Sequence, residues 1–335
     1  GPDGAAGGVP RPGPPVPPGL PVMTYVLNRL LSVILTLFLI TLVTFAVTNI
    51  LPGDVAMMIM GTQSNPEALE GLRQSLGLNE PLLVQYGNWI GGLLTGDWGT
   101  SLIFKKPIAE LLAQKAVASG IIVVMSMTIA LALAVPLGVW AAVHRDKWQD
   151  TVSSSASLMG VSLPDFFWGI VMILVFARWL GWFPSSGIVE PSEDFLGSLH
   201  YAFLPSLALG LGLMAHLTRM TRSTMTGILG QEFIRVARAK GLRESTVIWR
   251  YALANAIGPV ITIAGLQIGY LFGSIIVMES LFGYTGMGWL TYQALLNRDL
   301  PLIQATVFVI AAVVMITNLL VDLLYVLIDP RVKLG

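Results

Sequence analysis

Six long apolar runs decide most of what this chain of 335 residues can fold into. A helix needs about 20 consecutive apolar residues to cross the hydrocarbon core of a bilayer. The runs are Leu30 to Leu51, Ala116 to Val143, Ala156 to Gly181, Phe195 to Thr218, Tyr251 to Met278 and Leu300 to Val321. Only 11% of the residues are charged, against about 25% in soluble domains. The sequence therefore predicts an all-α membrane protein with six transmembrane helices.

The third run is the least regular of the six. Pro164 interrupts it and Asp165 lies inside it, while the stretch from Phe166 to Ala177 is too short to cross alone. We expect the residues on both sides of the break to form one span, whose ends the pattern does not fix.

Lysine and arginine favour the cytoplasmic side of a membrane protein. With both termini inside, 13 of the 19 Lys and Arg residues fall on the cytoplasmic side and 6 outside, where 10 acidic residues accompany them. This asymmetry predicts a multi-pass protein with cytoplasmic termini.

The chain divides into a tail and one transmembrane domain. Residues 1–22 are rich in Pro and Gly and are expected to be disordered. Met23 is interpreted as the natural start, because the leading Gly1-Pro2 looks like a protease scar. Residues 23–335 form the transmembrane domain.

The longest outer segment, residues 52–115, is predicted to be a small helical cap. Asn65 and Pro66 start a first helix with Leu69, Leu72 and Leu76 on one face, and Gly77 ends it. A second helix follows Pro81 with an apolar stripe from Leu82 to Leu93, and the turn Gly96-Asp97-Trp98-Gly99 closes it. About 60 residues bury too little surface to stand alone, so the cap should rest on the membrane helices.

A basic stretch lies within the loop 219–256, between the fourth and fifth runs. Seven Lys and Arg residues lie from Arg219 to Arg250, against two acidic residues, Glu232 and Glu244. Its centre, Glu232 to Gly241, has the spacing of a short helix ended by glycine. The apolar side chains at helical spacing are Phe233, Val236 and Ala237, and the basic ones are Arg235, Arg238 and Lys240. Such a helix is predicted to dock onto a partner; the alternative is a basic connection lying on anionic lipid.

Acidic residues in apolar runs are the candidates for a transport pathway, because a charge in the membrane is costly. Asp165 lies within the third run and Glu279 at the outer end of the fifth, with Phe282 just beyond it. For each acid, a structural role at a helix end is the alternative. Asp322, at the inner end of the sixth run, is expected to pair locally.

Catalytic and metal-binding patterns were not found. The sequence has no GxxxxGK loop followed by Ser or Thr, no GxSxG, no HExxH and no cysteine. Three scattered histidines predict no metal site, and a formal net charge of zero gives no indication of nucleic-acid binding.

Several ordered motifs carry a family resemblance that covers nearly everything from Met23 onward. They are Leu51-Pro52-Gly53-Asp54, Gly77-Leu78-Asn79-Glu80-Pro81, Gln85-Tyr86, Gly96-Asp97-Trp98-Gly99, Ala237-Arg238-Ala239-Lys240-Gly241, Phe282-Gly283-Tyr284-Thr285-Gly286-Met287-Gly288, and Asp322 through Tyr325 to Asp329-Pro330-Arg331. The chain resembles the membrane permease subunits of ATP-binding-cassette importers, specifically the first of the two permeases in the dipeptide, oligopeptide and nickel group. Two positions depart from the pattern: Thr285 stands where the family commonly has proline, and Arg235-Val236-Ala237 stands where the coupling motif of the wider superfamily begins Glu-Ala-Ala.

The resemblance implies a type I importer permease in a bacterial or archaeal cytoplasmic membrane, with an extracytoplasmic cap between helices 1 and 2. It implies that Glu232, Arg235, Ala237, Arg238, Ala239, Lys240 and Gly241 form the loop that couples to an ATPase subunit. It further implies a second permease, two ATP-binding subunits that use ATP and Mg, and an outer substrate-binding protein, with no ATPase site or cofactor on this chain itself. Contacts with the binding protein are expected at Asp97, Trp98 and Asp299.

The implied cargo is a di- or oligopeptide, with glutathione or a nickel chelate as alternatives within the same group. Two other classes of protein stay open from the residues alone. A secondary transporter would use Asp165 or Glu279 for a coupling ion, but it would have no use for the basic helix, and no repeat between the two halves is visible. An intramembrane enzyme is disfavoured by the missing catalytic constellation.

Overall fold

The computed structural model describes residues 22–50, 55–60, 65–75 and 77–328. Within these ranges the elements are helices, apart from one isolated bridge between Thr100 and Pro107. The helices are α1 (Val22–Ile50), α2 (Val55–Met60), α3 (Pro66–Ser75), α4 (Leu82–Thr95), α5 (Ile108–Val143), α6 (Trp148–Ser162), α7 (Asp165–Met172), α8 (Phe195–Leu229), α9 (Glu232–Ala239), α10 (Glu244–Thr246), α11 (Leu253–Leu281), α12 (Met287–Leu296) and α13 (Leu300–Ile328), with π-helical stretches η1 (Ile173–Trp179) and η2 (Val247–Ala252). The predicted tail and the motifs at 51–54 and 329–331 lie outside the described residues, except for Val22 of the tail.

Five described helices are long and apolar enough to cross a membrane, and there are six if α6 and the bent segment of α7 and η1 count as one broken span. This confirms the all-α membrane fold. The third run is broken at Pro164, as expected; its helix begins at Trp148, before the apolar run, and its two parts are bent by 98°. The bend has a local cause. Pro164 disfavours the helical conformation at the residue before it, and Leu163 is extended, with φ −104° and ψ 134°.

The second and fourth spans are longer than their apolar runs. Helix α5 begins at Ile108 rather than Ala116, and α8 continues past Thr218 to Leu229. Both extensions carry polar and charged residues, so hydropathy alone does not detect them.

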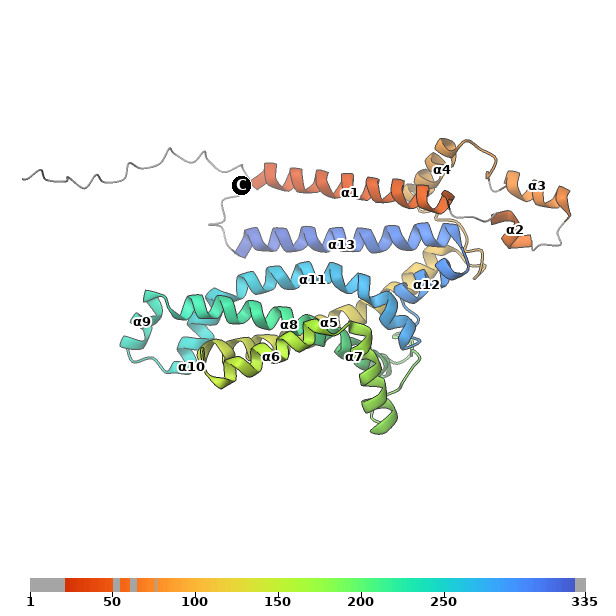
Figure 1. Cartoon of the computed structure of the whole chain (residues 1–335). Coiled ribbons are helices and arrows are strands. Elements are labelled where there is room, and N and C mark those ends of the chain that lie inside the picture. Colours follow the sequence, from red (N-terminus) through yellow and green to blue (C-terminus); the bar gives the residue numbers. More distant parts are fainter. Residues whose placement is uncertain (1–21, 51–54, 61–64, 76, 329–335) are drawn as a thin grey trace, which may run out of the picture.

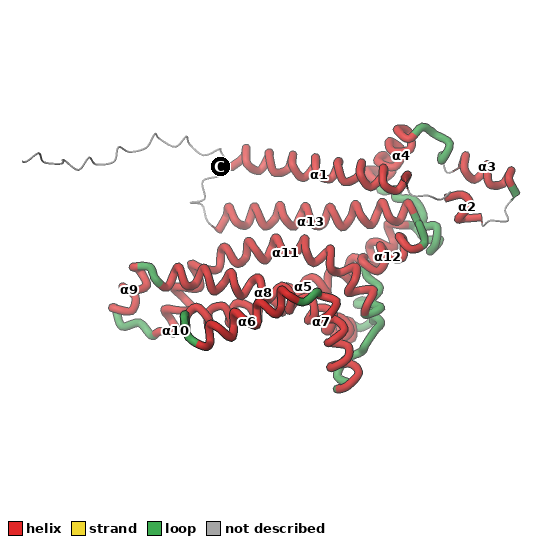
Figure 2. Tube along the Cα trace, in the orientation of Figure 1, coloured by secondary structure: helices red, strands yellow, loops and turns green. Residues whose placement is uncertain are grey.

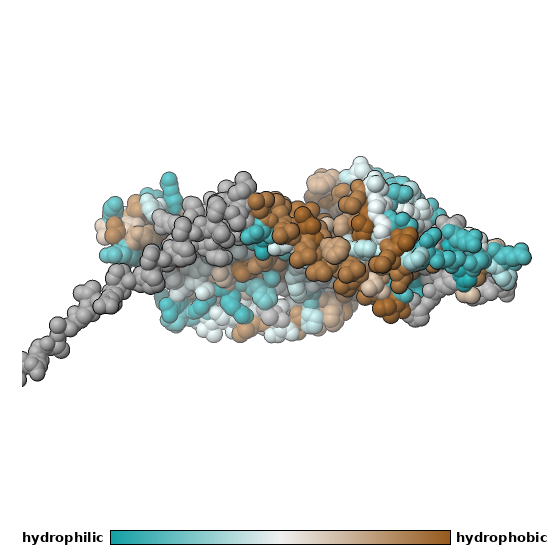
Figure 3. Space-filling model, turned by 90° about the horizontal axis from the view of Figure 1, so that it is seen from above, coloured by the Kyte–Doolittle hydropathy of each residue, from teal (hydrophilic) through white to brown (hydrophobic). Residues whose placement is uncertain are grey.

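The helices run between two ends of different composition (Figures 1 and 2). The start of α1, the end of α13, and α9 with α10 lie at one end, while α2 to α4 and α12 lie at the other. The basic stretch therefore shares an end with the outermost described turns of α1 and α13, as the predicted topology requires. Viewed from above, the face that carries α1 shows an apolar surface along the middle of the molecule with hydrophilic surface at the two ends (Figure 3). Leu31 and Ile34 of α1 are each 64% exposed, which is the arrangement of a helix that faces lipid.

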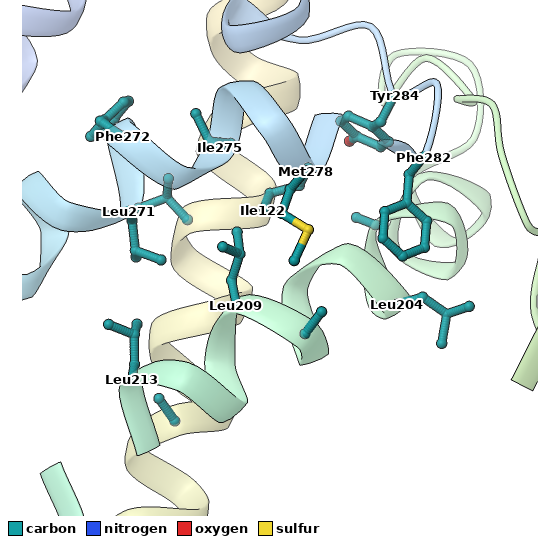
Figure 4. Packing of buried hydrophobic residues seen from close by; sticks show 14 of the residues in the cluster. Ile122, Leu204, Leu209, Leu213, Leu271, Phe272, Ile275, Met278, Phe282 and Tyr284 are labelled. Carbon is teal, nitrogen blue, oxygen red and sulfur yellow. The ribbon is translucent and has the colours of Figure 1, made fainter. Parts of the chain in front are cut away.

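The main core lies between α5, α8 and α11 (Figure 4). Ile122 of α5, Leu209 and Leu213 of α8, and Leu271 and Met278 of α11 have almost no exposed surface. These helices bring together residues about 150 positions apart in the sequence. The core is therefore a bundle around α8, and α1 packs outside it against α13.

The two cap helices form as the sequence predicts. The side chain of Asn65 accepts a hydrogen bond from the Glu67 N–H at 3.1 Å, and Gly77 and Gly96 have left-handed φ values of 67° and 86°. Leu69 is buried, whereas Leu76 lies outside the described residues. The cap rests on α1 through aromatic contacts, with ring centroids 5.3 Å apart for Phe45 and Tyr86.

Candidate functional site

The basic loop folds as a short helix, α9, at the end of the bundle. Glu232 lies in its first turn, where a carboxylate is favoured by the helix dipole. Gly241, just beyond the end of α9, has φ +75°, a backbone conformation that residues other than glycine rarely adopt. The chain thus leaves α9 through a turn that glycine permits, and it re-enters the bundle through α10 and η2.

Two residues attach α9 to the rest of the chain. Ile234 is fully buried and Ala237 is 6% exposed, in a cluster with Met225 of α8 and Val247 of η2. This changes the predicted apolar face. Ala237 packs against its own chain, whereas Phe233 and Val236 are 38% and 47% exposed and are not part of that cluster. Ile234 was missed because the sequence does not say on which side the bundle lies.

The basic residues of α9 differ in their pairing. Arg238 donates two hydrogen bonds to Glu244, at 2.6 and 3.1 Å, and these bonds raise the pKa of the Arg238 guanidinium. Within the described part of the chain, the side chains of Arg235 and Lys240 have no hydrogen bond or ion pair. Together with the exposed Phe233 and Val236, they give α9 an outward surface that is apolar and cationic.

Asp165, the first residue of α7, lies at the bend of the third span. Its carboxylate accepts a hydrogen bond of 2.9 Å from the hydroxyl of Tyr270 in α11, whose ring is half exposed. It also lies against Gly212 of α8, which has no room for a side chain on that side. Asp165 thus joins three helices at the bend.

Glu279 near the end of α11 has no exposed surface. It accepts hydrogen bonds from the Ser119 hydroxyl of α5 and, at 2.9 Å, from the Trp289 N–H of α12. A buried carboxylate with this set of donors holds α5, α11 and α12 together. The geometry favours this structural role, and the pathway role of Glu279 stays a prediction.

The glycine-rich motif after α11 forms the turn that encloses Glu279. Gly283 has φ +56°, and a methyl group at Gly288 would lie 2.7 Å from Cα of Ile276. Phe282 is 2% exposed and packs in the main core, so it does not line an open channel in this conformation. Burial in the apolar surroundings of this turn raises the pKa of Tyr284 to about 12.

Two family models together match nearly all of residues 22–334 of this chain. Residues 22–132 match the N-terminal model of binding-protein-dependent transport system membrane components, and residues 134–334 match the model of binding-protein-dependent transport system inner membrane components. The chain belongs to this family. It is a membrane-embedded permease of an ATP-binding-cassette importer.

Named relatives cover this permease over nearly its whole length. It is 37% identical to the dipeptide transport system permease protein of Alkalihalophilus pseudofirmus, over 93% of this chain and 100% of that protein. It is 36% identical to the glutathione transport system permease protein of Escherichia coli strain K12, over 93% of this chain and 99% of that protein. Among solved structures, the inward-facing MetNI methionine ABC transporter matches with a TM-score of 0.56 at 17% identity, over 67% of this chain and 98% of that one. That likeness supports the type I importer fold.

The three residues expected to contact a binding protein lie in different settings in the permease. Asp97 is exposed, and its carboxylate accepts a hydrogen bond from the Gly99 N–H. Trp98 is half buried against Phe308 of α13. Asp299 has no exposed surface. This burial disfavours the predicted contact of Asp299 with a binding protein.

The buried carboxylate of Asp299 instead attaches the cap to α13. It accepts hydrogen bonds from the Ser101 hydroxyl at 2.6 Å, from the Ile103 N–H at 3.2 Å, and from the Leu302 N–H in the first turn of α13 at 3.3 Å. The last of these is a helix-capping contact. Contacts of Asp97 and Trp98 with a binding protein stay predictions.

Two ion pairs were not identified from the sequence. Asp150 at the start of α6 accepts hydrogen bonds from two nitrogens, Nε and Nη2, of the Arg222 guanidinium on α8. Asp322 of α13 forms an ion pair with Arg29 of α1. Asp322 therefore pairs as predicted, but with a residue of another helix rather than a local one. Both pairs lie at the end of the bundle that carries α9. No sequence signal specifies these partners, because the paired residues are 72 and 293 positions apart.

Proposed function

We propose that this permease imports peptides as one of two related permeases, driven by two separate ATP-binding subunits and supplied by an outer substrate-binding protein. ATP and Mg would act at the ATP-binding subunits, with no cofactor on this chain. The cargo assignment is supported by relatives named for dipeptide and peptide transport. Glutathione, a modified tripeptide, is the second candidate, because a relative that matches the same share of this chain is named for glutathione transport.

The proposed coupling element is the outward surface of α9. Its exposed Phe233 and Val236 could enter an apolar groove, and Arg235 and Lys240 could pair with acidic groups at the rim of that groove. Because Ile234 and Ala237 hold the other face, movement imposed on α9 would be transmitted to α8 and η2. Such rigid-body transmission is a known mode of alternating access. This division of the helix into an anchored face and a free face is the observation that carries the proposal.

The end of the bundle that carries α9 is placed in the cytoplasm, with both chain termini on the same side. This placement rests on the distribution of Lys and Arg in the sequence and on the shared end of α1, α9 and α13. The cap and α12 would then face the binding protein.

The coupling proposal is tested by charge substitution on the free face. Val236→Asp should abolish co-purification of the ATP-binding subunits, because a carboxylate replaces an apolar contact, while membrane insertion is unchanged. Arg145→Glu, in the exposed loop between α5 and α6, is the matched control and should keep the complex intact. A Val236→Asp complex that assembles and imports normally would contradict the proposed docking surface.

The cargo is tested by ATP-driven uptake of dialanine and of glutathione in reconstituted vesicles.

A further inference from the structure

A pocket of about 250 Å³ lies between α6 and α8, near the end of the bundle that carries α9. Its lining includes Ser153 and Ser157 of α6, and Thr218, Arg219 and Arg222 of α8. Hydroxyl and guanidinium groups are donors to anions. The volume suits one charged group and its neighbours and is below the roughly 300–1,000 Å³ of sites that hold a whole ligand.

The donors in this pocket are not satisfied within the described chain. The hydroxyls of Ser153 and Thr218 are buried, with 5% and 2% of each residue exposed, and they have no hydrogen-bond partner. Buried hydroxyls are normally paired, because leaving them unpaired costs free energy. Each of the two oxygens has less than 1 Å² of exposed surface, so an oxyanion in the pocket would accept from both once the hydroxyls rotate toward it.

The charges around the pocket leave one arginine available. Asp150 neutralises Arg222 through two hydrogen bonds, and the Asp146 N–H also donates to Asp150. Arg219 is exposed and has no ion pair in the part of the chain that the structure describes. The pocket therefore carries a net positive charge, and Arg219 supplies it.

Exposed polar residues flank the pocket on both helices, and on α6 they are followed by the exposed apolar Leu158 and Met159. On α8 the exposed residues His216, Arg219 and Ser223 recur at three- and four-residue spacing, and on α6 Thr151 and Ser155 do the same. Polar side chains in membrane segments face a protein interior or a water-filled cavity rather than lipid. This face of α6 and α8 therefore suits the wall of an aqueous passage.

We propose that this pocket binds the terminal carboxylate of a peptide in the inner half of the passage. In this arrangement Arg219 pairs with the carboxylate, and the hydroxyls of Ser153 and Thr218 donate to its oxygens. The choice of a carboxylate rests on the proposed peptide transport, since every unmodified peptide carries one.

The experiment measures ligand binding to the complex of this permease with its second permease and ATP-binding subunits, without the binding protein, in phosphatidylcholine nanodiscs. Saturation-transfer NMR compares dialanine with dialanine amide, which lacks the carboxylate. We expect the amide to bind about tenfold more weakly, the loss typical of a charge-assisted hydrogen bond. Arg219→Gln should lower dialanine affinity by a similar factor, and Arg219→Lys should restore most of it.

Ser153→Ala should weaken dialanine binding, whereas Ser155→Ala, an exposed serine on the same helix, should not. Equal binding of dialanine and its amide, or wild-type affinity in Arg219→Gln, would overturn the proposal. The proposal would also be overturned if phosphatidylglycerol displaced dialanine, bound more tightly than dialanine and required Arg219. That result would identify the pocket as a site for a lipid headgroup.

Uptake of dialanine by the wild-type importer is measured separately, so that the two proposals can fail independently. If dialanine is taken up but binds no better than its amide, the carboxylate-binding pocket is refuted and the proposed peptide transport stands. If dialanine binds better than its amide and this binding requires Arg219, but dialanine is not taken up, the pocket stands and the proposed cargo is refuted.

Discussion

Replacing Ile234 by alanine separates the anchored face of α9 from its free face. The Ile234 side chain is fully buried against α8 and η2, and truncation of such a residue costs about 2–5 kcal/mol. Helix α9 has only eight residues and cannot be stable by itself, so this loss falls on its attachment to the bundle. At about 1.4 kcal/mol for each factor of ten, a loss of 2 kcal/mol increases the open population of α9 about thirtyfold.

Hydrogen–deuterium exchange of the α9 amides measures that population, and ATP-driven uptake measures coupling. Ile234→Ala should speed exchange in α9 by at least the same factor while amides in the core of α5, α8 and α11 keep their protection, and uptake should fall. Val236→Ala is the matched control: this residue is 47% exposed, so exchange should change little. Unchanged exchange and uptake in Ile234→Ala would refute the idea that this side chain transmits force.

Three further substitutions test the other sites. Glu279→Gln should lower the thermal unfolding temperature, because an amide replaces the carboxylate bonded to Ser119 and the α12 backbone; lost transport at unchanged stability would instead support a pathway role. Asp299→Asn should increase proteolytic cleavage of the loop between the cap and α5, and an unchanged digestion pattern would argue against its attachment role. Gly241→Ala should impair coupling, because φ +75° costs a side-chain residue about 1–2 kcal/mol, whereas Gly230→Ala at φ −81° should be neutral in the same uptake assay.

The spans could be predicted from the sequence because hydropathy is a local property. A run such as Leu300 to Val321 has no other stable environment than a bilayer or a large core, whatever its neighbours are. The short helices α3, α4 and α9 were predictable for a similar reason, since Asn65, Gly96 and Gly241 act on the backbone within one turn. The order of these local signals also sufficed to identify the family.

The roles of the polar residues were decided only by the tertiary structure. Asp165 and Glu279 were identified as costly residues and Asp299 as a contact for the binding protein, but a carboxylate in a membrane protein can also join helices, and its partners decide its role. The partners Ser119 of Glu279 and Ser101 of Asp299 are 160 and 198 positions away. The exposed and anchored faces of α9, and the pocket beside Arg219, likewise depend on which helices pack together, because burial is set by neighbours in space rather than along the chain.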